Sequence, residues 1–180
     1  MNVFTLASLI LSLSSAGQGH DMKPEGAMGS VGFLAGDWKG TQTFYVGDGN
    51  TMVGQATDHA EYAVGGRFIE ERLSTTLTNR PPTDTRHMLG FDKKTGKYVA
   101  YWFNDTSSTA MELSGTLEES KLVLATKPGG PRSLRFTYDG SKDGELSLTF
   151  EMEVEGKWQV QFKSVYHKET VVLHDATKNI

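Results

Sequence analysis

Apolar and polar residues alternate along most of the chain from Gly36 onward. In the segment 145–154, ELSLTFEMEV, every second residue from Leu146 to Val154 is apolar and the residues between them are polar. A period of two is typical of a β-strand with one dry face and one wet face. The alternation predicts ten strands, at about 36–46, 52–63, 67–78, 85–92, 96–104, 109–116, 120–127, 132–139, 144–154 and 157–167.

Short turn sequences separate these strands, among them GDGN, VGG, DKKTG, KPGGP and EGK. Links this short force neighbouring strands to be antiparallel, because a parallel pair needs a long crossover. Ten such strands form a meander, which loses its exposed edges when it closes into a barrel. We therefore predict an all-β fold, a single antiparallel up-and-down β-barrel of about ten strands with a short N-terminal helical turn at SVGFLAG. A barrel of this width leaves space for a cavity.

The stretch FLAGDWKG places Trp38 between Gly36 and Gly40 at the start of the first strand. Residues two apart share a face of the strand, so the two glycines leave space beside the indole for another element to cross closely. All three residues are predicted to be structural. We expect Trp38 to be buried at one barrel end, beneath a turn formed by residues 31–35.

The segment LAGDWKGT is similar to the opening of lipocalin-like (calycin) barrels, and most of all to nitrobindin-like barrels and to the bacterial domain-of-unknown-function family 1579. For the latter family the resemblance extends to VGGRFIEER, HMLGFDKKTGKYVAYWFND and LSGTLEESKLVL, and it covers about residues 33–168. It implies the barrel fold with an indole at the closed end. The activity of the family is unknown, so the resemblance implies no chemistry.

Composition limits the classes of partner. The 180 residues are 37% hydrophobic and 22% charged, which fits one globular domain. A net charge of −4 and the lack of any Lys/Arg cluster argue against nucleic acid as a partner. The chain has no cysteine, which excludes disulfides, thiolate zinc sites and cysteine nucleophiles.

The N-terminal run VFTLASLILSL is apolar and is followed by the small residues Ser-Ser-Ala. It has the length of a signal peptide and is too short for an integral membrane span. We interpret residues 1–16 as a signal peptide, 17–30 as a flexible lead-in, 31–168 as the barrel and 169–180 as a C-terminal tail. A secreted or periplasmic protein is the expectation, and an N-terminal amphipathic or buried helix is the alternative.

No cofactor or metal is expected. Nitrobindin-like proteins bind haem through a histidine that points inward from a late strand, whereas His167 has outward parity in the corresponding segment WQVQFKSVYHKE. The five histidines show no metal-binding spacing. One alternative is copper chelation by His20, which would be third from the amino terminus if cleavage fell after Gly17.

Polar residues with inward parity are the candidate ligand site. Asp58 lies on one predicted strand, and Glu70 and Arg72 share a face of the next. Pairing about the VGG turn brings Asp58 opposite Arg72, so we predict that this pair lies inside the barrel. The other predicted ligand-binding residues are aromatic side chains with polar tips, namely Tyr62, Tyr98, Trp102 and Tyr138.

The sequence favours a binding module for a small, largely apolar molecule in the barrel cavity. One alternative is an enzyme that uses Asp58 or Glu70 as acid or base, and another is a structural or envelope protein whose barrel is filled solid. An internal Glu–Arg brace, or reversed parity of the strands, would remove the ligand site. No catalytic residue is assigned, and the sequence leaves a homodimer open.

Overall fold

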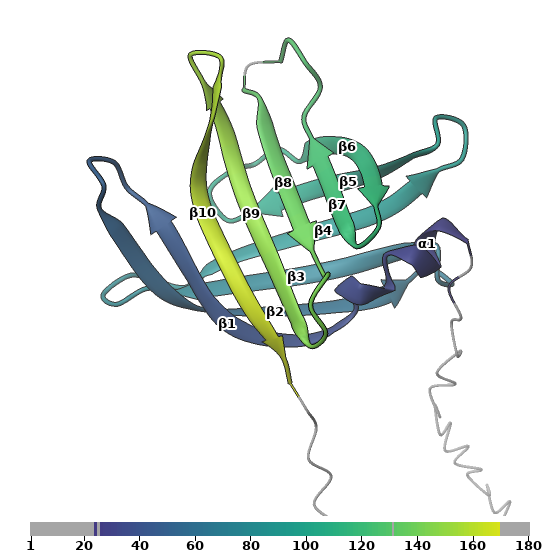
Figure 1. Ribbon diagram of the computed structural model, residues 1–180, viewed down its shortest axis with the longest axis horizontal. Coiled ribbons are helices and arrows are strands. Elements are labelled where there is room, and N and C mark those ends of the chain that lie inside the picture. The colour runs from purple at the N-terminus through teal and green to yellow at the C-terminus, as the bar shows by residue number, and fades with distance from the viewer. Residues whose placement is uncertain (1–23, 25, 131, 170–180) are drawn as a thin grey trace, which may run out of the picture.

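Ten antiparallel strands close into one barrel in the computed structural model of the chain, which describes residues 24, 26–130 and 132–169 (Figure 1). Around the barrel the order is β1-β10-β9-β8-β7-β6-β5-β4-β3-β2. The strands are β1 (Gly36–Tyr45), β2 (Thr51–Ala63), β3 (Phe68–Thr76), β4 (Thr83–Asp92), β5 (Lys97–Asn104), β6 (Met111–Glu118), β7 (Lys121–Ala125), β8 (Leu134–Asp139), β9 (Glu145–Val154) and β10 (Lys157–Lys168).

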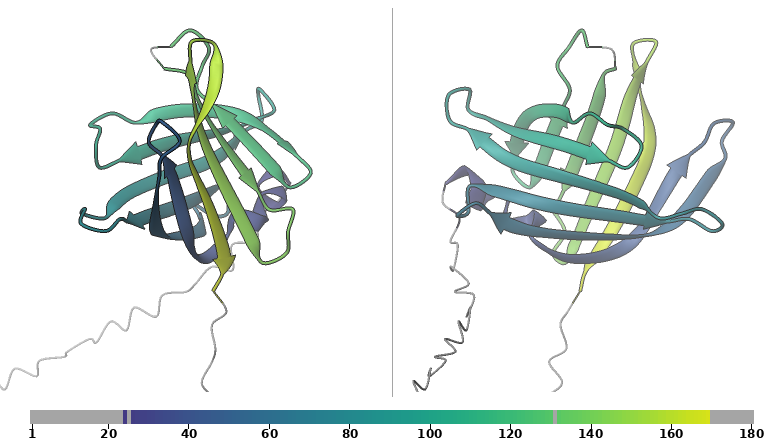
Figure 2. Two further views of the ribbon diagram at one scale, coloured as in Figure 1. Left: turned by 60° about the vertical axis from the view of Figure 1, so that its left-hand side comes forward. Right: turned by 180° about the vertical axis from the view of Figure 1, so that it is seen from behind.

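The predicted fold class is confirmed. Every strand pairs with its sequence neighbours, and β1 closes the barrel against β10. Figures 1 and 2 show β8–β10 crossing steeply over β2–β4, so the two walls face each other across the interior. Within the described residues, no helix has both the length and the apolar character needed to cross a membrane.

Two short helical segments, α1 (Ala27–Ser30) and η1 (Gly32–Leu34), cover one end of the barrel. They confirm the predicted helical turn. Residues 27–30, at the end of the predicted lead-in, form α1, and the buried side chain of Met28 fixes this helix to the barrel. The predicted signal peptide, residues 1–16, and most of the predicted C-terminal tail lie outside the described residues.

Trp38 lies at this closed end, beneath the η1 turn, as predicted. Its side chain is 5% exposed, and Nε1 donates a hydrogen bond to the carbonyl oxygen of Leu34 at 2.9 Å. Gly36 has φ of 142°, which favours glycine. A Cβ on Gly40 would lie 1.8 Å from the carbonyl oxygen of Val165. The glycines beside the indole therefore allow the close approach of β10, as the sequence predicted.

The β2–β3 hairpin corrects one prediction. Its loop spans residues 64–67, one residue more than predicted, so Asp58 pairs with Leu73 and not with Arg72. Because side chains alternate between the two faces of a strand, this shift moves Glu70 and Arg72 to the outer face. There Arg72 Nε donates to Glu70 Oε1 at 3.0 Å. The predicted Asp58–Arg72 pair inside the barrel does not exist.

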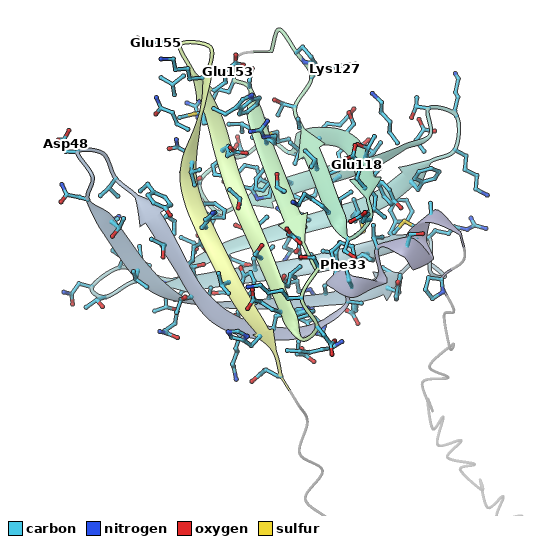
Figure 3. The ribbon with its side chains drawn as sticks, in the orientation of Figure 1. Phe33, Asp48, Glu118, Lys127, Glu153 and Glu155 are labelled. Carbon is cyan, nitrogen blue, oxygen red and sulfur yellow. The ribbon has the colours of Figure 1, made fainter. Side chains whose placement is uncertain are left out.

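The barrel interior is divided along its length. The half nearer α1 and η1 is filled with buried side chains, including Leu34, Ile69, Leu89 and Tyr98. The hairpin tips at Asp48 and Glu155 project away from that end, whereas Phe33 lies within it (Figure 3). The other half of the barrel contains the cavity described next.

Candidate functional site: a cavity above a buried polar cluster

A cavity of about 180 Å³ lies in the half of the barrel away from α1. Aromatic and aliphatic side chains line it together with polar ones, among them three threonines and the residues 104–106. The lining side chains come from β1, β3, β4, β5, β8, β9, β10 and the loop after β5, and they are Gln42, Phe44, Leu73, Thr75, Thr83, Thr85, His87, Trp102, Asn104, Asp105, Thr106, Phe136, Leu148 and Phe162.

Aromatic rings dominate the cavity wall. Phe136 and Trp102 meet edge to face with ring centroids 4.9 Å apart, and Phe136 stacks on Phe150 at 4.6 Å. Phe162 continues the series at 5.1 Å from Phe150. Such contacts stabilise one another and fix the rings, so the wall is a rigid apolar surface suited to a flat or apolar group.

A buried polar cluster lies beneath the cavity, formed by Glu71, His87 and Tyr138. His87 Nδ1 is 2.7 Å from Glu71 Oε2 and 2.7 Å from the Tyr138 hydroxyl, and that hydroxyl donates to Glu71 Oε2 at 2.6 Å. All three side chains are buried. Only His87 also lines the cavity, so it connects the cluster to the space above.

The cluster fixes the tautomer of His87. An Nδ1 without hydrogen would direct its lone pair at a carboxylate oxygen, so Nδ1 carries the hydrogen and donates it to Glu71. The remaining nitrogen, Nε2, points away from Glu71 and is an acceptor in the neutral ring. Nε2 is buried and has no hydrogen-bond partner among the described residues.

Asp58 extends the cluster from β2, two residues before Ala60, which pairs with Glu71. Burial, followed by the charge of Glu71, raises the pKa of Asp58 well above its usual value. Burial also acts to raise the pKa of Glu71, but the charge and hydrogen bond of His87, with the hydrogen bond of Tyr138, lower it. Of this pair, Asp58 is therefore the carboxyl group that holds its proton to higher pH.

Replacing Asp58 by asparagine is expected to change the pH dependence of stability. The folded protein keeps a proton on Asp58 that the unfolded chain releases above pH 3.8. The free energy of unfolding of the wild type therefore falls as pH rises from 3.8 to the raised pKa of Asp58, by up to about 1.4 kcal/mol per pH unit. Asp58→Asn lacks this loss and becomes more stable relative to wild type as pH rises. Urea unfolding of both proteins over this range measures the difference, and parallel pH profiles would contradict it.

The seven predicted ligand-binding residues fall into four places. Trp102 lines the cavity. Asp58 and Tyr138 belong to the buried cluster. Tyr62 and Tyr98 instead hold the N-terminal helix, donating to the carbonyl oxygens of residues 28 and 27 at 3.2 and 2.7 Å. Glu70 and Arg72, on β3, lie on the outer face of the barrel.

Sequence reasoning missed Glu71 and His87. The signal for Glu71 was present, because its inward neighbours Ile69 and Leu73 are both aliphatic, whereas the face chosen from the sequence carries Glu70 and Arg72. His87 has no such signal, since a single histidine in an alternating strand belongs to no motif. Among the described residues, no group of three or more His, Asp or Glu side chains is placed to hold a metal ion.

Two solved structures are similar to this barrel. One is Rv2717c from M. tuberculosis, with a TM-score of 0.61 and 16% identity, covering 82% of this chain and 100% of that chain. The other is the S-type phycobiliprotein lyase CPES from Guillardia theta, with a TM-score of 0.54 and 8% identity, covering 77% of this chain and 89% of that chain. At these identities the likeness shows the fold alone.

Sequence comparison gives the family. No curated protein matches the chain. The family described as "Protein of unknown function (DUF1579)" matches residues 31–168, which span the helical turn and all ten strands. The chain thus belongs to the DUF1579 family.

Proposed function

We propose that this protein binds a small, largely apolar molecule in the barrel cavity. The observation that carries the proposal is the aromatic-walled cavity of about 180 Å³. An apolar cavity of about 150 Å³ accommodates a benzene ring, so the volume fits one ring with a few substituents. A barrel filled solid for structural purposes would leave no such space.

The polar groups near the cavity support a specific ligand. Polar groups without partners in a protein interior cost free energy, and binding sites are where such groups are retained. The polar side chains of Gln42, Asn104 and Asp105 line the cavity together with the aromatic rings. The ligand is therefore apolar over most of its surface and polar at one point.

Titration with toluene tests binding in the cavity. We expect toluene to shift the NMR signals of cavity residues in the wild type. Thr85→Phe places a ring in the cavity and should abolish these shifts, whereas Arg86→Phe places the same ring on the outer face, where Arg86 is exposed, and should leave them. Shifts that persist in Thr85→Phe, or no shifts in the wild type, would contradict the proposal. Native mass spectrometry of protein from its own cells would then identify the natural ligand.

We also propose that the protein is secreted or periplasmic. The support is the apolar run at residues 3–13 followed by small residues, which is typical of a cleaved signal peptide. The mature chain is expected to begin near Gly17. Mass spectrometry of the protein recovered from its own cells measures the amino terminus, and an intact Met1 would contradict secretion.

A further inference from the structure

We propose that the ligand is a neutral aryl carbonyl compound, whose carbonyl oxygen accepts a hydrogen bond from the side-chain amide of Gln42. This inference rests on the proposed function and specifies its ligand. It is carried by a buried amide group whose oxygen is bonded within the protein and whose nitrogen opens on the cavity.

Gln42 lies on β1 and lines the cavity, although its residue is only 7% exposed. Thr75 of β3 reaches it over Gly54, where a Cβ would lie 2.9 Å from Thr75 Cγ2. Thr75 Oγ1 donates to Gln42 Oε1 at 2.5 Å, which orients the amide. Nε2 has no hydrogen-bond partner among the described residues and, unlike Trp102 Nε1, is not fully enclosed by protein atoms. Its two N–H donors therefore face the cavity that the side chain lines.

Aromatic rings flank this amide. Phe44 lies two residues further along β1 and so shares the inner face with Gln42. Phe162 pairs with Phe44 from β10, with ring centroids 5.8 Å apart, and both rings line the cavity. A ligand ring that packs against these two side chains would bring a carbonyl group attached to it next to Gln42.

The second amide that lines the cavity, Asn104, also uses its oxygen within the protein. Asn104 Oδ1 accepts from the backbone N–H of Thr106 at 3.0 Å and from its hydroxyl at 2.7 Å. A backbone N–H can only donate, so this contact identifies which amide atom is the oxygen. Both amides therefore keep their acceptors for the protein and their N–H groups for a ligand, which favours a ligand that brings acceptors.

Charge and hydrogen-bonding capacity select a neutral carbonyl group. The described residues that line the cavity include Asp105 but no lysine or arginine, so a carboxylate or phosphate ligand would be repelled. An ammonium group offers only donors and would leave Gln42 Nε2 without an acceptor. A hydroxyl group would also have to place its hydrogen, whereas Gln42 Oε1 already accepts from Thr75. A carbonyl oxygen has two lone pairs and no hydrogen to place.

Acetophenone and α-methylstyrene make the test, because they have nearly the same shape and differ by an oxygen atom in place of a methylene group. Since the two compounds differ in their transfer from water, the decisive quantity is the change in each affinity that a substitution causes, measured by NMR titration. Gln42→Met keeps the length of the side chain and removes both N–H donors. We expect it to weaken acetophenone binding about threefold to tenfold, the range for one net hydrogen bond, and not to weaken α-methylstyrene binding.

Gln55→Met is the matched control, because it makes the same change at an exposed residue on the outer face of β2. It should leave both affinities unchanged. The wild type supplies a measurement that needs no variant, since acetophenone should move the proton NMR signals of the Gln42 amide further downfield than α-methylstyrene does. Equal effects of Gln42→Met on the two compounds, or equal shifts of the Gln42 amide signals, would overturn the carbonyl inference and leave cavity binding intact. Binding of neither compound to the wild type would overturn both.

Discussion

Replacing Trp38 by alanine should lower the free energy of unfolding by about 3–5 kcal/mol, the usual cost of deleting a buried tryptophan ring. The indole is buried at the closed end of the barrel, and its N–H is paired with the carbonyl oxygen of Leu34. Alanine would leave a cavity there and an unpaired carbonyl beneath η1. The loss can be measured by urea unfolding, and a change below about 1 kcal/mol would contradict the structural role of the indole.

Trp158→Ala is the control with the same change in side chain. Trp158 is 38% exposed, and its ring stacks on the Arg135 guanidinium at 4.3 Å. Such a contact at an exposed site contributes about 0.5–1 kcal/mol, so we expect Trp158→Ala to cost no more than that. The difference between the two variants isolates the effect of burial at the closed end from the loss of an indole as such.

The fold could be predicted because its signals are local. Alternation marked each strand, and the turn residues between strands were short enough to force antiparallel neighbours. Strand ends consequently differ from prediction by only a few residues, as at β3, predicted to end at 78 and observed to end at Thr76. None of this depended on which residues face each other across the interior.

The site could not be predicted in full, because it depends on register. The loop between β2 and β3 is one residue longer than expected, which shifts the register of the two strands. Glu71 therefore faces inward, where the sequence had predicted Glu70 and Arg72. A similar shift occurs in β10, where a bulge between Val160 and Phe162 places Trp158 outside, although simple alternation puts it on the same face as Phe162. Long-range partners such as Glu71 and Tyr138 lie 67 residues apart in the sequence.

The buried cluster is where the fold accepts a cost in stability. Barrels of this size can be filled with apolar side chains, and replacing a buried ionic network by well-packed apolar residues is often neutral or stabilising. Here two carboxyl groups, an imidazole and a phenol occupy the centre of the barrel instead. A network of this kind at the base of a cavity fits a role in recognition better than a role in stability.

Glu71→Ala should be the most damaging single change in this cluster, with a loss of about 3–5 kcal/mol. It removes the carboxylate that accepts from both His87 Nδ1 and the Tyr138 hydroxyl, and it leaves these two buried groups with only each other as partners. Glu71→Gln keeps a carbonyl oxygen in place and should cost less. Urea unfolding at neutral pH measures these losses.

A double-mutant cycle separates the pairing from the packing. In Glu71→Leu, His87 stays buried without the carboxylate that it pairs with. If this stranded imidazole causes most of the loss, the double variant Glu71→Leu/His87→Leu should be more stable than Glu71→Leu alone, since no polar group of the pair is left behind. Glu70→Ala removes the neighbouring carboxylate on the outer face, where its partner Arg72 is exposed, and should cause only a small loss. Additive effects of Glu71→Leu and His87→Leu would show that the two side chains do not act as a pair.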